Sequence, residues 1–311
     1  MFGKIKHKIF DMKYNWSIIG HEKQLRQIEK DLLAGNLAHA YLLAGTNSVG
    51  KYTVAKKMAG ILQCENDFCH SCNTCLQIQK GSHIDTMEMS DDRESIKIEE
   101  VRKLIDRLNM TKQSPYKVVL IQTLERMTTE AANSFLKILE EPPSRTIFIM
   151  TTNNVRILLP TVLSRVRIVK FGCVSYEYLV EKLTELYPNC DAEVIKQVSL
   201  FSLGKTGRAV RLMENLDVRA EYMKTYQNVQ NFLGHKNVVD RFSYIEDVVE
   251  DPAQIEIFFN ILTSVLRSKI IGGDDASNKY IKTLSKIDEA GMLLTKNVNA
   301  RLVLENLMLS L

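Results

Sequence analysis

The chain of 311 residues lacks any apolar run long enough to span a bilayer, and its first residues lack the hydrophobic region of a secretory signal. These absences predict a cytoplasmic protein that does not contact a membrane. A strong excess of one charge is also missing. The net charge of +4 permits contact with a nucleic-acid backbone but does not require it, because such binding depends on clustered charge. At this length and with 45% hydrophobic residues, we expect two or three globular domains.

The first 171 residues alternate between apolar runs of strand length and helical patterns. A basic lead-in, residues 1–14, precedes them and contains Met12 as an alternative start. The predicted strands are Ala40–Ala44, Lys117–Ile121, Thr146–Thr151 and Arg167–Phe171, and the predicted helices are Glu22–Leu33, Tyr52–Leu62, Ile98–Leu108 and Thr129–Glu140. Buried strands that alternate with helices predict an α/β fold with a parallel sheet.

Strand patterns fade after Phe171, and the remaining residues show successive amphipathic helices. Breaks are expected where helix-stopping residues fall, near Pro188, Gly204, Gly234, Pro252 and Gly272–Gly273. The pattern predicts three domains: an α/β domain over residues 1–171, a small helical domain over 172–214 and an all-α C-terminal domain over 215–311.

The segment GTNSVGKYT, Gly45–Thr53, carries most of a phosphate-binding loop, G-x-x-x-x-G-K-[ST]. Gly45, Gly50 and Lys51 have the required spacing, and a strand precedes the loop while a helix follows it. The residue after the lysine should hold Mg²⁺ through a hydroxyl, but Tyr52 stands there and its oxygen lies too far from the backbone. Thr53 is one residue late, which turns it about 100° away on a helix. ATP or ADP binding without turnover and a loop retained for packing are both open.

The acidic residues of such a site are missing as well. An ATP-hydrolysing loop needs a second strand that ends in acidic residues, which hold Mg²⁺ and activate water. After the strand Lys117–Ile121 come Gln122 and Thr123, which carry no charge. Glu125 follows two residues late. A loop at the strand end could swing it inward, but we interpret it as a solvated residue at a helix start. The loss of two metal-handling positions favours a catalytically silent site.

Four of the six cysteines form the pattern C-x4-C-x2-C-x2-C, at Cys64, Cys69, Cys72 and Cys75. In a chain without an export signal, such a cluster favours metal binding over disulfides. Four thiolates close a tetrahedral shell and describe a structural zinc site. The alternatives are reduced cysteines without metal and an iron–sulfur cluster, and His70 is a substitute ligand.

Several phrases occur in the order seen in one protein family: LAHAYLLAG (residues 37–45), the cysteine cluster, GSHID (81–85), AANSFLKILEEPP (131–143) and LPTVLSRVR (159–167). Over residues 18–171 the chain resembles the AAA+ subunits of the bacterial DNA polymerase III clamp loader, and among them the delta-prime type. The resemblance implies an AAA+ P-loop domain with a parallel sheet, a helical lid and a helical C-terminal collar that assembles subunits.

The resemblance also implies roles for two arginines. In this family a Ser-Arg-Cys phrase presents an arginine in trans to the ATP of the neighbouring subunit, and here the phrase is Ser164-Arg165-Val166. A guanidinium suits the charge of a transferring phosphoryl group. Arg208, in GKTGRAV, is similar to the second-sensor arginine of the lid; the alternative is that it holds the lid by an ion pair and touches no phosphate. Thr151 or Thr152 occupies the first-sensor region, and the alternative is that both are ordinary strand residues. The alternative for Arg165 is an ordinary surface arginine.

The implied function is that of a delta-prime-like subunit that helps to load the sliding clamp and does not hydrolyse ATP itself. Its implied partners are the gamma/tau and delta subunits, the sliding clamp, primed duplex DNA and, indirectly, the single-strand-binding protein. Candidates for contact with the DNA backbone are the helix start near Thr128 and Thr129 and lysines such as Lys103 and Lys112. The alternative is a gamma/tau-type ATPase with a divergent nucleotide site, from which the missing acidic pair distinguishes this chain.

Overall fold

The computed structural model describes residues 12–89, 95–234, 238–273, 277–296, 298–309 and 311, so most of the basic lead-in lies outside it. The chain forms two compact units, one ending at Cys173 and the other beginning at Val174. Among the described residues, no helix combines the length and the apolar character needed to cross a membrane.

The first unit contains a five-stranded sheet in which every pair of neighbouring strands is parallel, as the sequence predicts. The order is β2-β3-β4-β1-β5, and Leu42 of β1 lies opposite Met150 of β4 and Ile168 of β5. The three inner strands are buried along their whole length, which explains why they appear in the sequence as continuous apolar runs. The strands are β1 (Ala40–Ala44), β2 (Thr86–Met89), β3 (Lys117–Ile121), β4 (Thr146–Thr152) and β5 (Arg167–Lys170).

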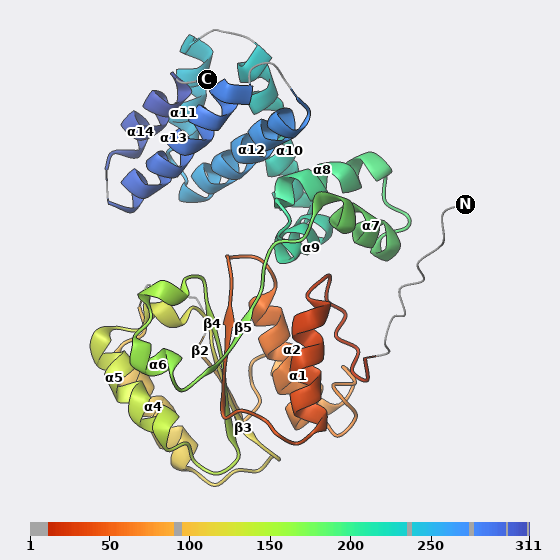
Figure 1. Cartoon of the computed structure of the whole chain (residues 1–311), viewed down its shortest axis with the longest axis vertical. Coiled ribbons are helices and arrows are strands. Elements are labelled where there is room, and N and C mark those ends of the chain that lie inside the picture. Colours follow the sequence, from red (N-terminus) through yellow and green to blue (C-terminus); the bar gives the residue numbers. More distant parts are fainter. Residues whose placement is uncertain (1–11, 90–94, 235–237, 274–276, 297, 310) are drawn as a thin grey trace. The chain divides into compact units, whose positions relative to one another are not determined.

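Helices cover both faces of this sheet (Figure 1). Because side chains alternate along a strand, Tyr41 and Leu43 of β1 face one core and Ala40 and Leu42 face the other. The first core is completed by α1 (Glu22–Leu33) and α2 (Lys51–Gln63), and the second by α4 (Ile98–Asn109) and α5 (Thr129–Glu140). The short elements are α3 (Asn73–Gln79), η1 (Leu124–Arg126), η2 (Val155–Ile157) and α6 (Pro160–Leu163). The strand β2 and the helix α3 are not predicted by the sequence patterns.

The described part of the second unit consists of helices, and helices end near each predicted break, whereas a further break after Thr295 is not predicted by the sequence. The division of this unit into a lid over residues 172–214 and a collar over 215–311 stays a prediction. The helices are α7 (Tyr176–Leu186), α8 (Ala192–Ser202), α9 (Thr206–Glu214), α10 (Leu216–Gly234), α11 (Val238–Val248), α12 (Pro252–Ile271), α13 (Ser277–Thr295) and α14 (Ala300–Met308).

Candidate functional site

Three polar segments meet at the carboxyl edge of the sheet, because the strands that precede them are neighbours. The glycine loop follows β1, Asn153 follows β4, and Gln122 follows β3, in the spatial order β3-β4-β1. Ligands of open parallel sheets bind at this edge. The loop is therefore in the position that a nucleotide site requires.

Lys51, the lysine of the loop, is folded back onto the loop itself. Its Nζ donates hydrogen bonds to the carbonyl oxygens of Gly45 (2.7 Å) and Thr46 (2.7 Å) and to Asn153 Oδ1 (3.0 Å). The residue is buried, with 6% of its surface exposed. The sequence patterns do not identify Asn153 as part of this site; its position after a strand that neighbours β1 is the only signal. In this arrangement the ammonium group stabilises the loop from within.

The two loop glycines have backbone conformations that other residues rarely adopt. Gly50 caps the start of α2 with a φ of 91°. A Cβ on Gly45 would lie 2.2 Å from the carbonyl oxygen of Phe171, so the chain after β1 passes directly against the end of β5. The loop is also supported by His21, whose Nε2 donates to the carbonyl oxygen of Val49 (3.0 Å) and whose ring lies on Phe171.

Tyr52, which replaces the Mg²⁺-binding hydroxyl, is directed toward the edge strand β2. Its hydroxyl donates to Glu88 Oε2 (2.9 Å), and Lys56 Nζ lies 3.1 Å from the same oxygen. Burial, with the nearby negative charge of Glu88 adding to it, raises the pKa of Tyr52 well above its usual value. The phenol therefore stays protonated and keeps donating to Glu88. Thr53 is exposed on the next position of the helix.

The segment after β3 brings one acidic group toward the site, contrary to the interpretation of Glu125 as a solvated residue. Glu125 Oε1 accepts a hydrogen bond from the backbone N–H of Asn153 (2.8 Å), and Oε2 is buried without a partner among the described residues. Thr123 has a left-handed backbone and donates its N–H to Thr151 Oγ1 (3.0 Å). The left-handed turn reverses the chain after β3 and brings Glu125 back over the end of β4.

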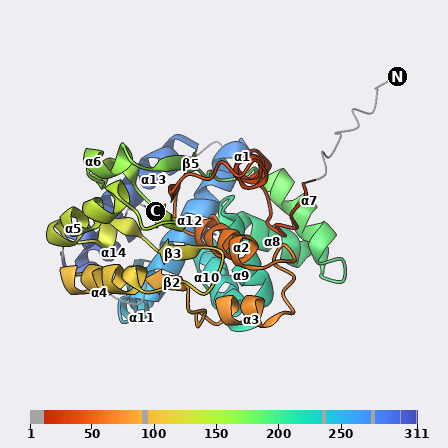
Figure 2. The ribbon, with the colours of Figure 1, turned by 90° about the horizontal axis from the view of Figure 1, so that it is seen from below.

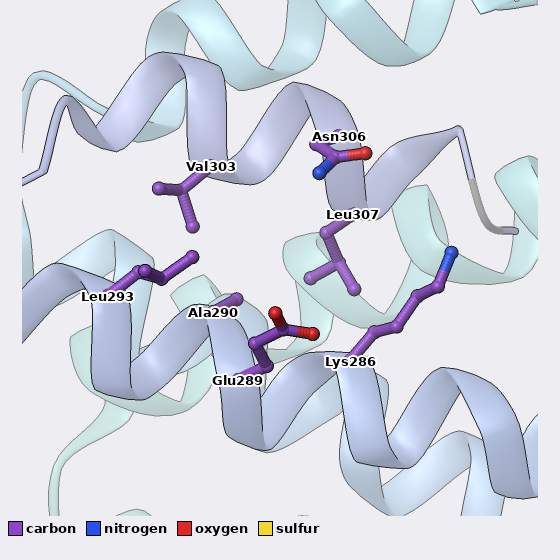
Figure 3. A pocket seen from close by; sticks show the side chains of 7 residues that line it. All are labelled: Lys286, Glu289, Ala290, Leu293, Val303, Asn306 and Leu307. Atoms are coloured by element: carbon purple, nitrogen blue, oxygen red, sulfur yellow. The ribbon is translucent and has the colours of Figure 1, made fainter.

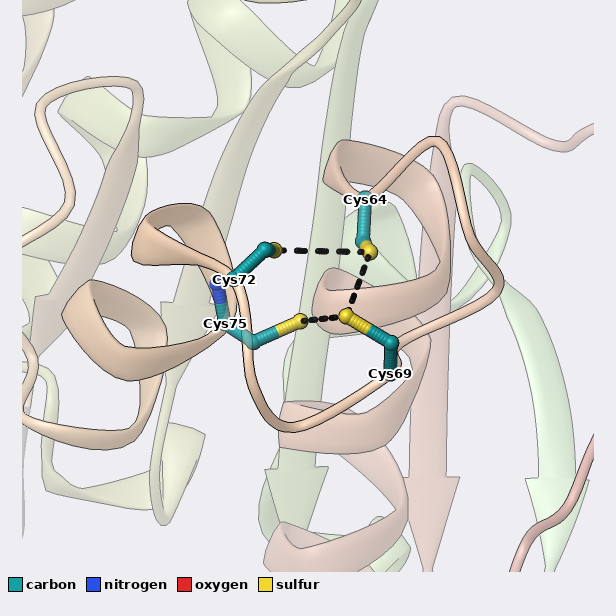
Figure 4. Close-up of side chains that lie close together, drawn as sticks. All are labelled: Cys64, Cys69, Cys72 and Cys75. Atoms are coloured by element: carbon teal, nitrogen blue, oxygen red, sulfur yellow. Dashed lines mark hydrogen bonds between the residues drawn. The ribbon is translucent and has the colours of Figure 1, made fainter.

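The four cysteines lie together beside the C-terminus of α2 (Figure 4). Their sulfur atoms all lie within 4.8 Å of one another, and the closest pairs are Cys64–Cys72 at 3.8 Å and Cys64–Cys69 and Cys69–Cys75 at 3.9 Å. A hydrogen bond from the Ser71 hydroxyl is the main cause that lowers the pKa of the Cys69 thiol to about 5. This arrangement is a possible metal site with four sulfur donors.

The loop that carries the cysteines is fixed to α2 by an aromatic contact. A Cβ on Gly60 would lie 2.3 Å from the ring of Phe68, so the ring packs directly on the helix backbone. Positive φ angles turn the chain tightly at Asp67 and Phe68, between Cys64 and Cys69, and again at His70, just after Cys69. The His70 ring lies on Phe68, and its Nδ1 is hydrogen bonded to Gln79 (2.9 Å). His70 is therefore held outside the sulfur cluster. In the view of Figure 2, α3, which carries Cys75, lies below α2.

Arg165 lies at the surface of the first unit, directly after α6. Its Nη1 donates to the carbonyl oxygen of Thr161 (2.8 Å) and to Ser164 Oγ (3.0 Å), and its Nη2 lies 2.5 Å from Glu140 Oε1. Val166, which replaces the cysteine of the family phrase, packs against the core between the sheet and α4 and α5. The Arg165 side chain is 34% exposed.

Arg208 belongs to the second unit and is buried there. Its Nη2 lies 3.4 Å from Glu256 Oε1 of α12, and its Nη1 is buried without a partner among the described residues. Within the second unit, this arginine joins α9 to α12.

A small pocket of the same unit lies between α13 and α14, where the side chains of Leu293, Val303 and Leu307 approach one another (Figure 3). No glycine loop borders this pocket.

Comparisons with known proteins place the chain among replication proteins. Residues 20–175 match the family model described as "DNA polymerase III, delta subunit". The gamma subunit of DNA polymerase III from Buchnera aphidicola (subsp. Schizaphis graminum) is 30% identical over 246 residues, which cover 76% of this chain and 68% of the relative. The delta-prime subunit from Bacillus subtilis is 30% identical over 71% of this chain and 65% of its own length. The match to the Escherichia coli tau subunit, at 27% identity, covers 38% of that longer protein.

The solved structure of a gamma-subunit-related protein from Thermotoga maritima has the same fold, with a TM-score of 0.51 and 22% identity over 92% of this chain and 97% of that chain. The gamma and delta-prime relatives are equally similar in sequence, so identity does not separate the two subunit types. The separation has to come from the chemistry of the site.

Proposed function

We propose that this chain, which belongs to the family of DNA polymerase III clamp-loader subunits, is a delta-prime-type subunit that hydrolyses no ATP itself. The observation that supports this most is the direction of Tyr52. The side chain in the Mg²⁺ position is hydrogen bonded to Glu88 on an edge strand, and neither Gln122 nor Thr123 supplies a charge for a metal. Lys51 is meanwhile occupied by carbonyl oxygens of its own loop.

In this proposal the chain's contribution to catalysis lies in Arg165, which acts on ATP bound by the neighbouring subunit. A guanidinium can bind the spread negative charge of a transferring phosphoryl group, and such an arginine is worth roughly 10³–10⁵ in rate at its own site. The partners in this proposal are the gamma/tau and delta subunits, the sliding clamp and primed duplex DNA, with indirect contact to the single-strand-binding protein. The place of action is the cytoplasm, and residues 215–311 form the collar that holds the subunits together.

Zinc is the metal that we propose for the cysteine cluster. Four sulfur ligands about 2.3 Å from a zinc ion lie about 3.8 Å from one another when they occupy the corners of a tetrahedron. The closest sulfur pairs, at 3.8 and 3.9 Å, already have this spacing. The four sulfurs fill the shell, so the ion has a structural role.

The second candidate is a gamma/tau-type ATPase with a divergent site, and Glu125 favours it. Its carboxylate contacts Asn153, which in turn accepts from Lys51, so an acidic group does lie near the loop. Under this alternative, Mg²⁺-dependent turnover by the isolated chain should be readily measured and should vanish in both Lys51→Ala and Glu125→Gln.

The test measures ATP hydrolysis by the isolated chain and by the clamp loader reassembled with the gamma/tau and delta subunits of the same organism. We expect negligible turnover by the isolated chain. Arg165→Ala should silence the one ATP site that this arginine serves and so lower the DNA-stimulated rate, while assembly stays intact by gel filtration. Arg156→Ala, another exposed arginine of the same unit, is the matched control. Equal rates for the two variants would refute the proposed role of Arg165.

A further inference from the structure

Arg165 is paired with an acidic side chain of its own unit. Its Nη2 lies 2.5 Å from Glu140 Oε1, and its Nη1 donates to the carbonyl oxygen of Thr161 and to Ser164 Oγ. Both terminal nitrogens of the guanidinium therefore have oxygen partners within the unit. The two charged side chains remain partly accessible, at 34% exposure for the arginine and 49% for the glutamate.

Two helix ends create this pair. Glu140 is the last residue of α5, and one residue later come Pro142 and Pro143, which cannot continue the helix. A carboxylate at a helix C-terminus is repelled by the negative end of the helix dipole. Arg165 follows the C-terminus of α6 and supplies the positive charge that offsets this repulsion. The pair is therefore a favourable resting arrangement for both residues.

We propose that Glu140 holds Arg165 in a resting arrangement and competes with the neighbouring subunit's nucleotide for the same guanidinium. This inference rests on the proposed role of Arg165. When Nη2 binds a phosphate oxygen of the neighbouring ATP, its bond to Glu140 has to be broken or shared. A terminal phosphate offers more negative charge and more acceptor oxygens than a carboxylate, so it displaces Glu140.

The size of the effect follows from the exposure of the pair. Ion pairs between partly exposed side chains change an equilibrium by up to about fivefold. Glu140 therefore weakens the trans contact to ATP by a few-fold and does not block it. The competition raises the KM of the clamp loader for ATP. The rate at saturating ATP, kcat, depends on Arg165 itself.

The pairing is tested first in the isolated chain with phenylglyoxal, a dicarbonyl reagent that modifies accessible guanidinium groups. Peptide mass spectrometry follows the modification of Arg165 over time. Glu140→Gln should raise the modification rate by about two- to fivefold, because it removes the negative charge that pairs with Nη2. Glu141→Gln is the matched control: it removes the same charge one residue later, from an exposed side chain that no described ion pair joins to Arg165. Equal rates in the two variants would overturn the inference.

The competition is tested in the reassembled clamp loader. Glu140→Gln should lower the KM for ATP of the DNA-stimulated reaction by up to about fivefold with little change in kcat, and Glu140→Asp, which keeps the charge, should restore most of the original KM. A fall in kcat to the level of Arg165→Ala would mean that Glu140 aims the guanidinium productively, which overturns the competition. If Arg165→Ala lowers the rate and Glu140→Gln behaves as Glu141→Gln does, only this inference fails. If Arg165→Ala has no effect, the proposed function fails and this inference fails with it.

Discussion

Replacing Gly45 by alanine tests whether the first glycine of the phosphate-binding loop is required for packing. The Cβ of the alanine would lie 2.2 Å from the carbonyl oxygen of Phe171 and 3.1 Å from its carbonyl carbon. Both neighbours are backbone atoms at the end of β5. The same backbone is held to β1, because Phe171 N–H donates to the carbonyl oxygen of Ala44 at 2.7 Å. Neither side can move away alone.

The cost follows from this contact. Atoms at 2.2 Å have to separate by about 1 Å, and overpacking of a close-packed site costs typically 1–3 kcal/mol. Because backbone and not a flexible side chain has to move, we expect a loss near the upper end, about 3 kcal/mol of unfolding free energy. Gly172→Ala is the matched control: no heavy atom lies within 4 Å of the position that its Cβ would occupy. Its effect should stay within about 0.5 kcal/mol.

Trp16 makes the measurement specific for the first unit. It is the only tryptophan of the chain, and it is buried in the core between the sheet and α1 and α2. Urea unfolding followed by its fluorescence should show a midpoint about 1 M lower for Gly45→Ala, given a denaturant slope of about 3 kcal/mol per molar. The reasoning is refuted if Gly45→Ala unfolds at the same urea concentration as Gly172→Ala. If Gly45→Ala were as stable as Gly172→Ala but no longer bound nucleotide, the glycine would be required for a ligand and not for packing.

Three further predictions concern the metal, the pH and the helical unit. The purified chain should carry one zinc ion by elemental analysis and Cys75→Ser should carry almost none, while zinc retained by the variant would contradict a four-sulfur site. Burial lowers the pKa of His21, so its neutral form is favoured in the folded chain, and stability should fall as the pH drops below about 6.5, toward the lower folded pKa. His21→Gln should reduce this loss, as followed by Trp16 fluorescence; an unchanged pH profile would contradict the assignment. Arg241 donates to carbonyl oxygens near the C-terminal ends of α10 and α14. Arg241→Met should therefore cost about 1–3 kcal/mol of unfolding free energy and lower the thermal midpoint of the helical signal. An unchanged midpoint would contradict this role.

The inner strands could be predicted from the sequence because each is buried on both faces. β1 and β3 appear as five-residue apolar runs, and their predicted bounds are those of the structure. The sequence patterns do not reveal β2, because this strand is short, lies at the edge of the sheet and carries Glu88. A polar residue in a four-residue run gives neither continuous apolar character nor a clear alternation.

The candidate site was only partly predictable, because its contacts join segments that are distant in sequence. Lys51 could be placed from the loop pattern, but its contact with Asn153 requires knowing that β4 lies beside β1. The same holds for Tyr52 and Glu88, whose contact joins α2 to the edge strand. The interpretation of Glu125 as a solvated residue is wrong, because the left-handed turn at Thr123 reverses the chain and no sequence pattern identifies a left-handed threonine.

The retained residues of the loop have roles in the fold that no ligand is needed to explain. Gly45 allows the close approach of β1 to the end of β5, Gly50 starts α2 with a positive φ, and Lys51 binds carbonyl oxygens of its own loop. Their presence therefore gives little information about ATP turnover. The informative positions are those that only a metal requires. At one of them stands Tyr52, whose hydroxyl donates to Glu88. Because the glycines and the lysine are explained by packing alone, a test of the proposed subunit type has to address the Mg²⁺ position at Tyr52 and the uncharged pair Gln122 and Thr123.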